Sequence, residues 1–177
     1  MRVVLLSTFD LGRQPFGLAS PAAWLKRAGF EVRCVDLSRD KLSPDVMTGA
    51  GLAAFYLPMH TATRLALPVI ARLRAIDPSL TIAAYGLYAP LNEALLRERG
   101  VSIVLGPESE QELVEAVGAS GASGALGALG ANPLPRLAFI PPDRTGLPPL
   151  DRYASLQMPD GSSKVVGATD ATRGCKH

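Results

Sequence analysis

Short apolar runs recur along the first 117 residues, and each is followed by a segment with helical spacing of its apolar positions. A short continuous apolar run bounded by turn residues is typical of a strand that is buried on both faces of a parallel sheet. The pattern predicts strands at residues 3–7, 31–37, 52–57, 80–85 and 101–105. Strands that alternate with helices predict an α/β fold. For five strands the usual arrangement is the flavodoxin-like (Rossmann-like) order 2-1-3-4-5.

Capping signals predict where the helices between these strands begin and end. Ser20-Pro21 is typical of an N-cap followed by proline at the first helical position, and Gly29 suits the end of that helix. Thr61 or Thr63 is predicted to cap a helix that stops at Asp77-Pro78. The remaining helices are predicted at Ser43-Pro44, at residues 91–99 and after the capping box Ser109–Glu112.

The composition changes after residue 117. Residues 118–130 contain only Gly, Ala, Ser and Leu, with five glycines, which predicts a flexible linker. Prolines recur from residue 132 to 149 and predict an extended segment. A last strand is predicted at residues 164–168, after an Asp160-Gly161 turn. The chain therefore divides into an α/β domain (1–117), a linker (118–149) and a C-terminal part (150–177).

Charge and cysteine content narrow the class of protein. The 18 basic and 16 acidic residues are interspersed, and no basic tract predicts nucleic-acid binding. No apolar run approaches the roughly 20 residues of a membrane span, and the N-terminal run is too short for a signal peptide. Cys34 and Cys175 lie far apart, which argues against a disulfide framework. These features predict a cytoplasmic protein without nucleic-acid or membrane partners.

A ligand of an open parallel α/β sheet is expected beyond the carboxyl ends of the strands. Four predicted loops meet at that edge, and helix N-termini follow them with N–H groups that can bind an anion. Glycines directly after strands allow close approach of a ligand to the backbone. The candidate cofactor-binding residues in these loops are Thr8, Asp10, Gly12, His60, Thr61, Gly86, Tyr88, Gly106 and Glu108.

Each candidate also has a structural interpretation. The glycines can serve the turns alone, and Asp10 can stabilise its own loop. His60 can make a backbone hydrogen bond, and Glu108 suits a position near a helix N-terminus without any ligand. A phosphoacceptor receiver domain is a natural competitor for a chain of this size and order. It would need an acidic pair after the first strand and an aspartate at the end of the third, where Tyr56-Leu57-Pro58 stands instead.

Five segments together resemble radical S-adenosylmethionine enzymes with an N-terminal cobalamin-binding-type domain. LAAFYLPMHTATRLALPVI (52–70), TIAAYGLYAP and LGPESEQELVEAV look like the third, fourth and fifth units of that domain. PDRTGLPPLDRY resembles the segment that leads into the catalytic barrel, and VVGATDATRGCKH looks like the first barrel strand and the start of its cluster loop.

The resemblance implies that the front domain binds cobalamin and presents it to the chain's own C-terminal barrel. That barrel would hold a 4Fe-4S cluster and S-adenosylmethionine, with Cys175 as the first cluster ligand. The chain ends before the second and third cysteines of the C-x3-C-x2-C loop, so we expect the 177 residues alone to have no radical activity. Asp10 is followed by Leu11 and Gly12, so the Asp-x-His-x-x-Gly motif of cobalamin mutases is missing. Two alternatives stay open, a scaffold domain without cobalamin and an unrelated small-molecule-binding α/β domain.

Overall fold

The computed structural model describes residues 1–121 and 140–170. Five strands form one parallel sheet in the order β2-β1-β3-β4-β5, which confirms the predicted topology. They are β1 (Arg2–Ser7), β2 (Glu31–Asp36), β3 (Ala50–Tyr56), β4 (Thr81–Tyr85) and β5 (Ile103–Val104). The sheet is buried in its centre because helices cover both faces, as expected for right-handed crossovers between parallel strands.

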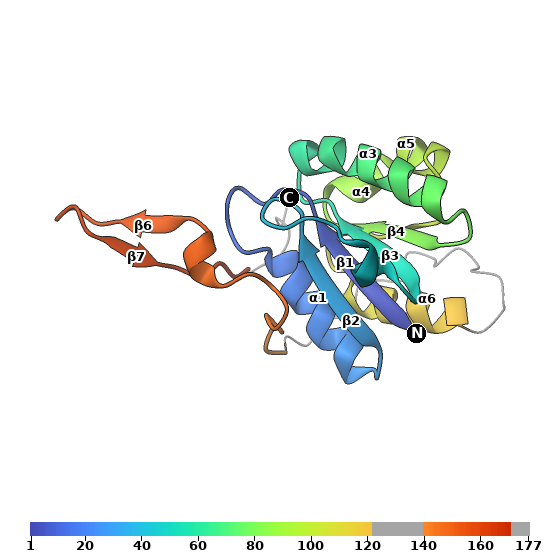
Figure 1. Cartoon of the computed structure of the whole chain (residues 1–177), viewed down its shortest axis with the longest axis horizontal. Coiled ribbons are helices and arrows are strands. Elements are labelled where there is room, and N and C mark those ends of the chain that lie inside the picture. The colour runs from blue at the N-terminus through green and yellow to red at the C-terminus, as the bar shows by residue number, and fades with distance from the viewer. Residues whose placement is uncertain (122–139, 171–177) are drawn as a thin grey trace, which may run out of the picture.

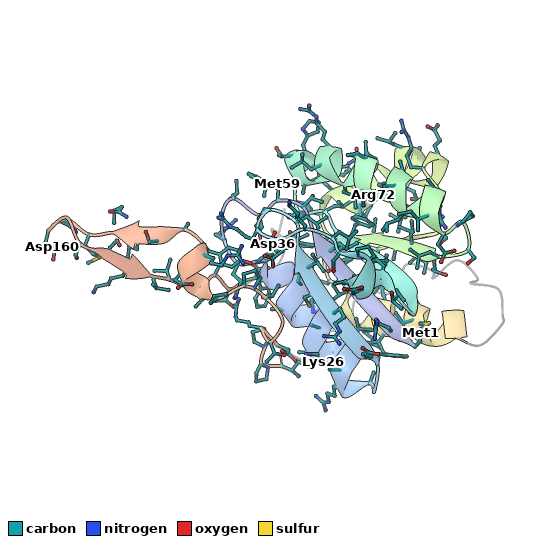
Figure 2. The ribbon with its side chains drawn as sticks, viewed as in Figure 1. Met1, Lys26, Asp36, Met59, Arg72 and Asp160 are labelled. Atoms are coloured by element: carbon teal, nitrogen blue, oxygen red, sulfur yellow. The ribbon has the colours of Figure 1, made fainter. Side chains whose placement is uncertain are left out.

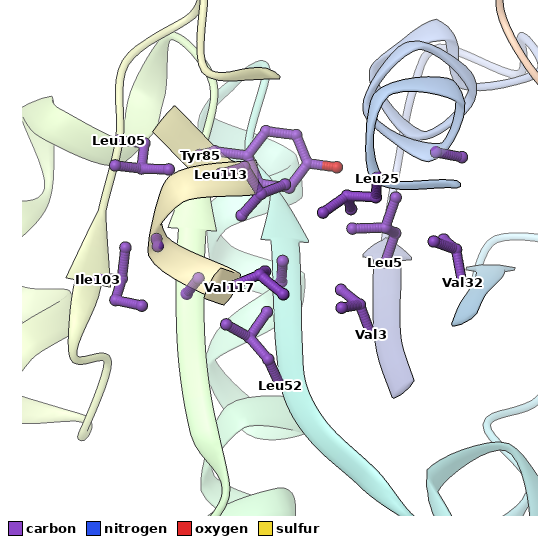
Figure 3. Close-up of a cluster of buried hydrophobic side chains, with 14 of the residues drawn as sticks. Val3, Leu5, Leu25, Val32, Leu52, Tyr85, Ile103, Leu105, Leu113 and Val117 are labelled. Carbon is purple, nitrogen blue, oxygen red and sulfur yellow. The ribbon is translucent and has the colours of Figure 1, made fainter. Parts of the chain in front are cut away.

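Helices cover both faces of the sheet (Figure 1). On the first face, α1 (Phe16–Arg27) and α6 (Glu110–Gly121) pack over the alternate strand residues Val3, Leu5 and Leu52 (Figure 3). Val4 and Leu6 of β1 point to the second face, since successive side chains of a strand point to opposite sides. The helices on that face are α2 (Pro44–Met47), α3 (His60–Ile76), α4 (Tyr88–Leu91) and α5 (Glu93–Glu98).

Helix α1 begins at Phe16, so the prediction that Ser20-Pro21 starts this helix is wrong. Pro21 lies inside the helix and has no N–H to donate to the carbonyl of Gly17, four residues earlier. The Tyr85 hydroxyl of β4 donates to that carbonyl at 2.7 Å. Ser20 is not a cap, because its hydroxyl donates to Glu110 Oε1 at 2.7 Å. A partner 64 residues away in sequence thus allows a proline inside the helix.

Replacing Tyr85 by phenylalanine tests this compensation. The substitution leaves the Gly17 carbonyl without the Tyr85 donor, so we expect the free energy of unfolding to fall by about 1–2 kcal/mol. In a Pro21→Ala background the same substitution should cost clearly less, because the alanine N–H can donate to Gly17. Urea unfolding of the four variants gives the coupling energy. An equal cost in both backgrounds would contradict the compensation.

Other helix boundaries differ from the prediction for local reasons. Helix α3 starts at His60 with Met59 as its N-cap, and the Thr63 hydroxyl donates back to the Met59 carbonyl at 3.2 Å. Neither predicted threonine is therefore the N-cap. The helix predicted at residues 91–99 begins earlier and is divided at Asn92 into α4 and α5. Helix α6 continues to Gly121, into the predicted linker, and residues 122–139 lie outside the described residues.

The C-terminal residues form a strap and a hairpin. The strap (residues 140–154) runs along α1 and ends in a 3₁₀ helix, η1 (Leu150–Arg152). It is followed by β6 (Ser155–Gln157) and β7 (Ser163–Val165), which pair antiparallel and project away from the domain (Figure 1). The Asp160-Gly161 turn closes this hairpin, with Ser162 N–H donating to Asp160 Oδ1 at 2.9 Å. The turn prediction is confirmed, but the interpretation of the last strand as the first strand of a barrel is wrong.

Candidate functional site at the carboxyl edge of the sheet

The register of the sheet brings the carboxyl ends of four strands to one edge. Ser7 at the end of β1 lies opposite both Asp36 of β2 and Tyr56 of β3, and Tyr56 lies opposite Tyr85 of β4. The loops that carry the candidate residues follow these ends. Thr8 links the β1–α1 loop to the first turn of α3, because its buried hydroxyl donates to the Ala62 carbonyl at 2.8 Å. Thr8 thus has a structural role at this edge.

The strap covers the β1–β2 half of the edge. Ala154 N–H donates to the Gly12 carbonyl at 2.9 Å, and the side chain of Gln14 donates to the Pro148 carbonyl at 2.8 Å. On the neighbouring helix, Lys26 Nζ and Asp143 Oδ2 form an ion pair at 2.7 Å. These contacts leave Gly12 against the chain's own strap, so Gly12 does not face an open site.

Tyr153 closes the strap over the end of β2. Its ring lies against the Arg39 guanidinium, 5.3 Å from its centroid. Burial raises the pKa of Tyr153, and the neighbouring Asp36 carboxylate raises it further, because both disfavour a phenolate. Asp36 is fully buried at the end of β2, and Figure 2 labels it there. Asp36 is not among the candidates from the sequence, although a carboxylate that ends an apolar run beside the first strand is a signal for it.

Asp10 is the candidate whose electrostatics depart most from those of a surface carboxylate. It lies in the β1–α1 loop, where Leu11 and Gly12 both have positive φ, and only 9% of it is exposed. Burial raises its pKa to about 6, and Arg13, 3.6 Å away, opposes this effect. Asp170 and Asp36 raise the pKa further through repulsion between like charges. Asp10 therefore changes its charge close to neutral pH.

The β3–β5 half of the edge is free of the strap in the described part of the chain. His60 and Thr61 are exposed at the start of α3, and Tyr88 and Glu108 are half-buried in the segments after β4 and β5. Gly86 has a structural role, because its φ is +105° and a Cβ there would lie 2.9 Å from the Leu57 carbonyl oxygen. No atom lies within 4 Å of a Cβ built on Gly106, so this glycine borders open space.

Exposed leucines surround the same edge, and the sequence analysis did not single them out. Leu11 follows β1, Leu65 lies in the first half of α3, and Leu87 and Leu91 follow β4. Leu11 and Leu87 are each 57% exposed, and Leu91 is 73% exposed. A group of exposed apolar side chains on a folded domain is typical of a surface that contacts another molecule. For Leu11 and Leu87, the signal in the sequence was a leucine within a segment expected to be a turn.

The described residues offer little to a metal ion. Within 1–121 and 140–170 no group of three His, Cys, Asp or Glu side chains is placed to hold one. Burial raises the pKa of the Cys34 thiol to about 12, so this cysteine stays protonated and inert in β2. Cys175, the predicted cluster ligand, lies outside the described residues. Among the helices in the described ranges, none has both the length and the apolar character needed to cross a membrane.

Comparison with solved structures finds response regulators and receiver domains. An orphan response regulator of H. pylori is 16% identical, over 68% of this chain and 95% of that one, with a TM-score of 0.48. A CheY-like response regulator receiver domain protein from Methanospirillum hungatei is 13% identical, over 67% and 90%, with a TM-score of 0.47. A response regulator protein from Burkholderia multivorans is 20% identical, over 70% and 97%, with a TM-score of 0.48. No family model matches the chain, and no curated protein matches it.

These findings correct the resemblance to radical S-adenosylmethionine enzymes. The three similar structures are response regulators or receiver domains. The interpretation of the chain as the cobalamin-binding front part of a radical enzyme is therefore wrong, and so is its catalytic barrel as a partner. Of the strand predicted at residues 164–168, only residues 164 and 165 lie in a strand, β7, and it pairs antiparallel with β6 in a hairpin. The described residues likewise give no support for a 4Fe-4S cluster, S-adenosylmethionine or cobalamin.

Proposed function

We propose that this domain is a receiver-like module of signal transduction that binds a partner protein and does not accept a phosphoryl group. The observation that carries the proposal is the division of the carboxyl edge into two halves. The strap occupies the half next to Asp10 and Asp36, while the exposed side chains of Leu87 and Leu91 follow β4 on the other half. A surface of this kind suits contact with a protein better than enclosure of a small molecule, which needs a concave pocket.

The end of β3 supports the absence of phosphoryl transfer. Tyr56 ends this strand, and the next residue, Leu57, is fully buried. Its N–H donates to the Tyr85 carbonyl, and its carbonyl accepts from Tyr88 N–H. The apolar side chain of Leu57 cannot act as a nucleophile. Its backbone N–H and carbonyl are both hydrogen-bonded to the end of β4 and the loop that follows it. Asp10 and Asp36 therefore lack a carboxylate partner on β3.

The contact surface that we propose comprises the open loops after β3, β4 and β5. It includes the candidate residues His60, Thr61, Tyr88, Gly106 and Glu108 together with Leu87 and Leu91. Polar residues around exposed leucines match the usual arrangement of an apolar centre with a polar rim. Small-molecule binding at these loops is the alternative function. The cytoplasmic location expected from the cysteine content stays a prediction.

Phosphorylation and cross-linking together test this function. The 177-residue chain, incubated with acetyl phosphate and Mg²⁺, should show no phosphoryl adduct by intact-mass spectrometry. A photo-reactive amino acid at Leu91, introduced in the native host, should form a discrete cross-link to another protein. The substitution Leu87→Asp should abolish that cross-link, because it places a charge in the apolar centre of the contact.

The cross-linking experiment needs a control position on another part of the surface. Arg27 is also exposed but lies at the C-terminal end of α1, on the other face of the sheet, and a photo-reactive residue there serves as the control. A stoichiometric phosphoryl adduct would contradict the proposed absence of a phosphoacceptor. Equal cross-linking from positions 91 and 27 would contradict the partner surface.

A further inference from the structure

A groove on the helical face of α2 and α3 has no role in the function proposed above. It lies between the segment that contains α2 and the second half of α3, and it encloses a cavity of about 310 Å³. That volume is at the lower end of the range for small-molecule sites. Apolar side chains from both sides line this α2–α3 groove, namely Leu42, Pro44, Met47, Leu73, Ile76 and Leu80.

The groove continues into a second hollow along the same helix. Leu42 and Arg72 line both parts, and Leu37, Pro68 and Val69 extend the apolar lining toward the middle of α3. Figure 2 labels Arg72 on α3. Arg72 thus stands at the junction of two apolar hollows, where its guanidinium can meet the polar end of a molecule that lies in either one.

The four charged side chains that line the two hollows have unequal partners. Asp77 accepts hydrogen bonds from the backbone and hydroxyl of Ser79, and this holds its pKa below the usual range. Asp40 forms an ion pair with Arg152 at 2.9 Å. Neither Arg72 nor Lys41 has a hydrogen-bond or ion-pair partner among the described residues. Arg72 and Lys41 are therefore available to pair with an anionic ligand, while Asp77 keeps a negative charge in the lining of the α2–α3 groove.

We propose that the α2–α3 groove binds a small monocarboxylate with an aliphatic tail. The tail occupies the cavity between Met47, Leu73 and Leu80, and the carboxylate pairs with Arg72. A guanidinium presents two parallel N–H donors to a carboxylate, which fixes the orientation of the ligand as well as its affinity. Lys41 adds a second attractive charge at the same end. The ligand needs both a negative charge and an apolar tail.

Decanoate and decanol are probes that separate these two requirements. We expect decanoate to bind the full 177-residue chain saturably, with a Kd below about 1 mM by calorimetry. In ¹H–¹⁵N spectra the shifted amides should be those of residues 42–48 and 72–80. Arg72→Gln should weaken decanoate binding about tenfold, which is the usual order for a lost charge-assisted pair. Decanol should bind more weakly than decanoate and should not respond to this substitution.

Arg64→Gln is the matched control, because Arg64 is exposed on the same helix and lies outside the lining of the groove. It should leave decanoate binding unchanged. Circular dichroism of both variants checks that the fold is retained, which is expected for exposed positions. The proposal would be overturned by equal decanoate affinity in the wild type and Arg72→Gln. It would also be overturned if the shifted amides lay at the exposed leucines of the carboxyl edge instead.

Discussion

Gly86→Ala should lower the free energy of unfolding by about 3–5 kcal/mol, through two costs at one position. The φ of Gly86 is +105°, a backbone conformation that residues with a Cβ rarely adopt. A Cβ there would lie 2.9 Å from the carbonyl oxygen and 3.1 Å from the carbonyl carbon of Leu57. Leu57 cannot move away easily, because its carbonyl accepts from Tyr88 N–H at 3.0 Å. The clash is therefore with fixed backbone.

Gly106→Ala is the control for this prediction, since the two glycines follow neighbouring strands. Gly106 has no positive φ, and no atom lies within 4 Å of a Cβ built on it. Its substitution should change the free energy of unfolding by no more than about 0.5 kcal/mol. Urea unfolding of both variants under one set of conditions measures the difference. A Gly86→Ala protein within 1 kcal/mol of the wild type would show that the loop after β4 relaxes, against this expectation.

These two glycines also show the limit of the sequence. Both stand directly after a predicted strand, and the sequence offers the same two interpretations for each, a turn residue or a position of close approach to a ligand. The difference depends on backbone φ and on Leu57, which directly follows a different strand, β3. The strand order was predictable because it depends on alternating apolar runs and on general rules of topology. The role of one glycine depends on tertiary contacts that no local pattern encodes.

Long-range polar contacts explain why the strap could not be placed from the sequence. Arg144 donates to Gln14, 130 residues earlier, and Gln14 donates in turn to Pro148. Repeated prolines predict an extended segment, but they carry no information about what it packs against. The same holds for Pro21, which is a good start signal locally and lies inside a helix because Tyr85 supplies the missing donor. A tertiary contact overrides local helix propensity where a remote side chain donates to an otherwise unpaired backbone carbonyl.

Asp10→Asn should stabilise the protein at neutral pH by up to about 3 kcal/mol and should have little effect near pH 4. The pKa of Asp10 rises from an ordinary value of 3.8 to about 6 in the folded protein. Below about pH 4 the carboxyl is protonated in both states and contributes no difference. Between pH 4 and 6 the unfolded chain ionises first, so the stability that the protonated group gives the fold is lost as pH rises. An amide at this position does not ionise and avoids the loss.

The pH dependence distinguishes titration of Asp10 from a simple change in packing. The stabilisation by Asp10→Asn should grow between pH 4.5 and 7.5 in urea unfolding experiments, while Asp45→Asn, at an exposed site on α2, should show no such growth. A constant difference at both pH values would mean that the amide improves packing alone. Burial is the main cause of the raised pKa, and Asp170 and Asp36 add to it by repulsion. Since Asp170 follows the hairpin, ionisation of Asp10 adds repulsion between the β1–α1 loop and the C-terminal segment.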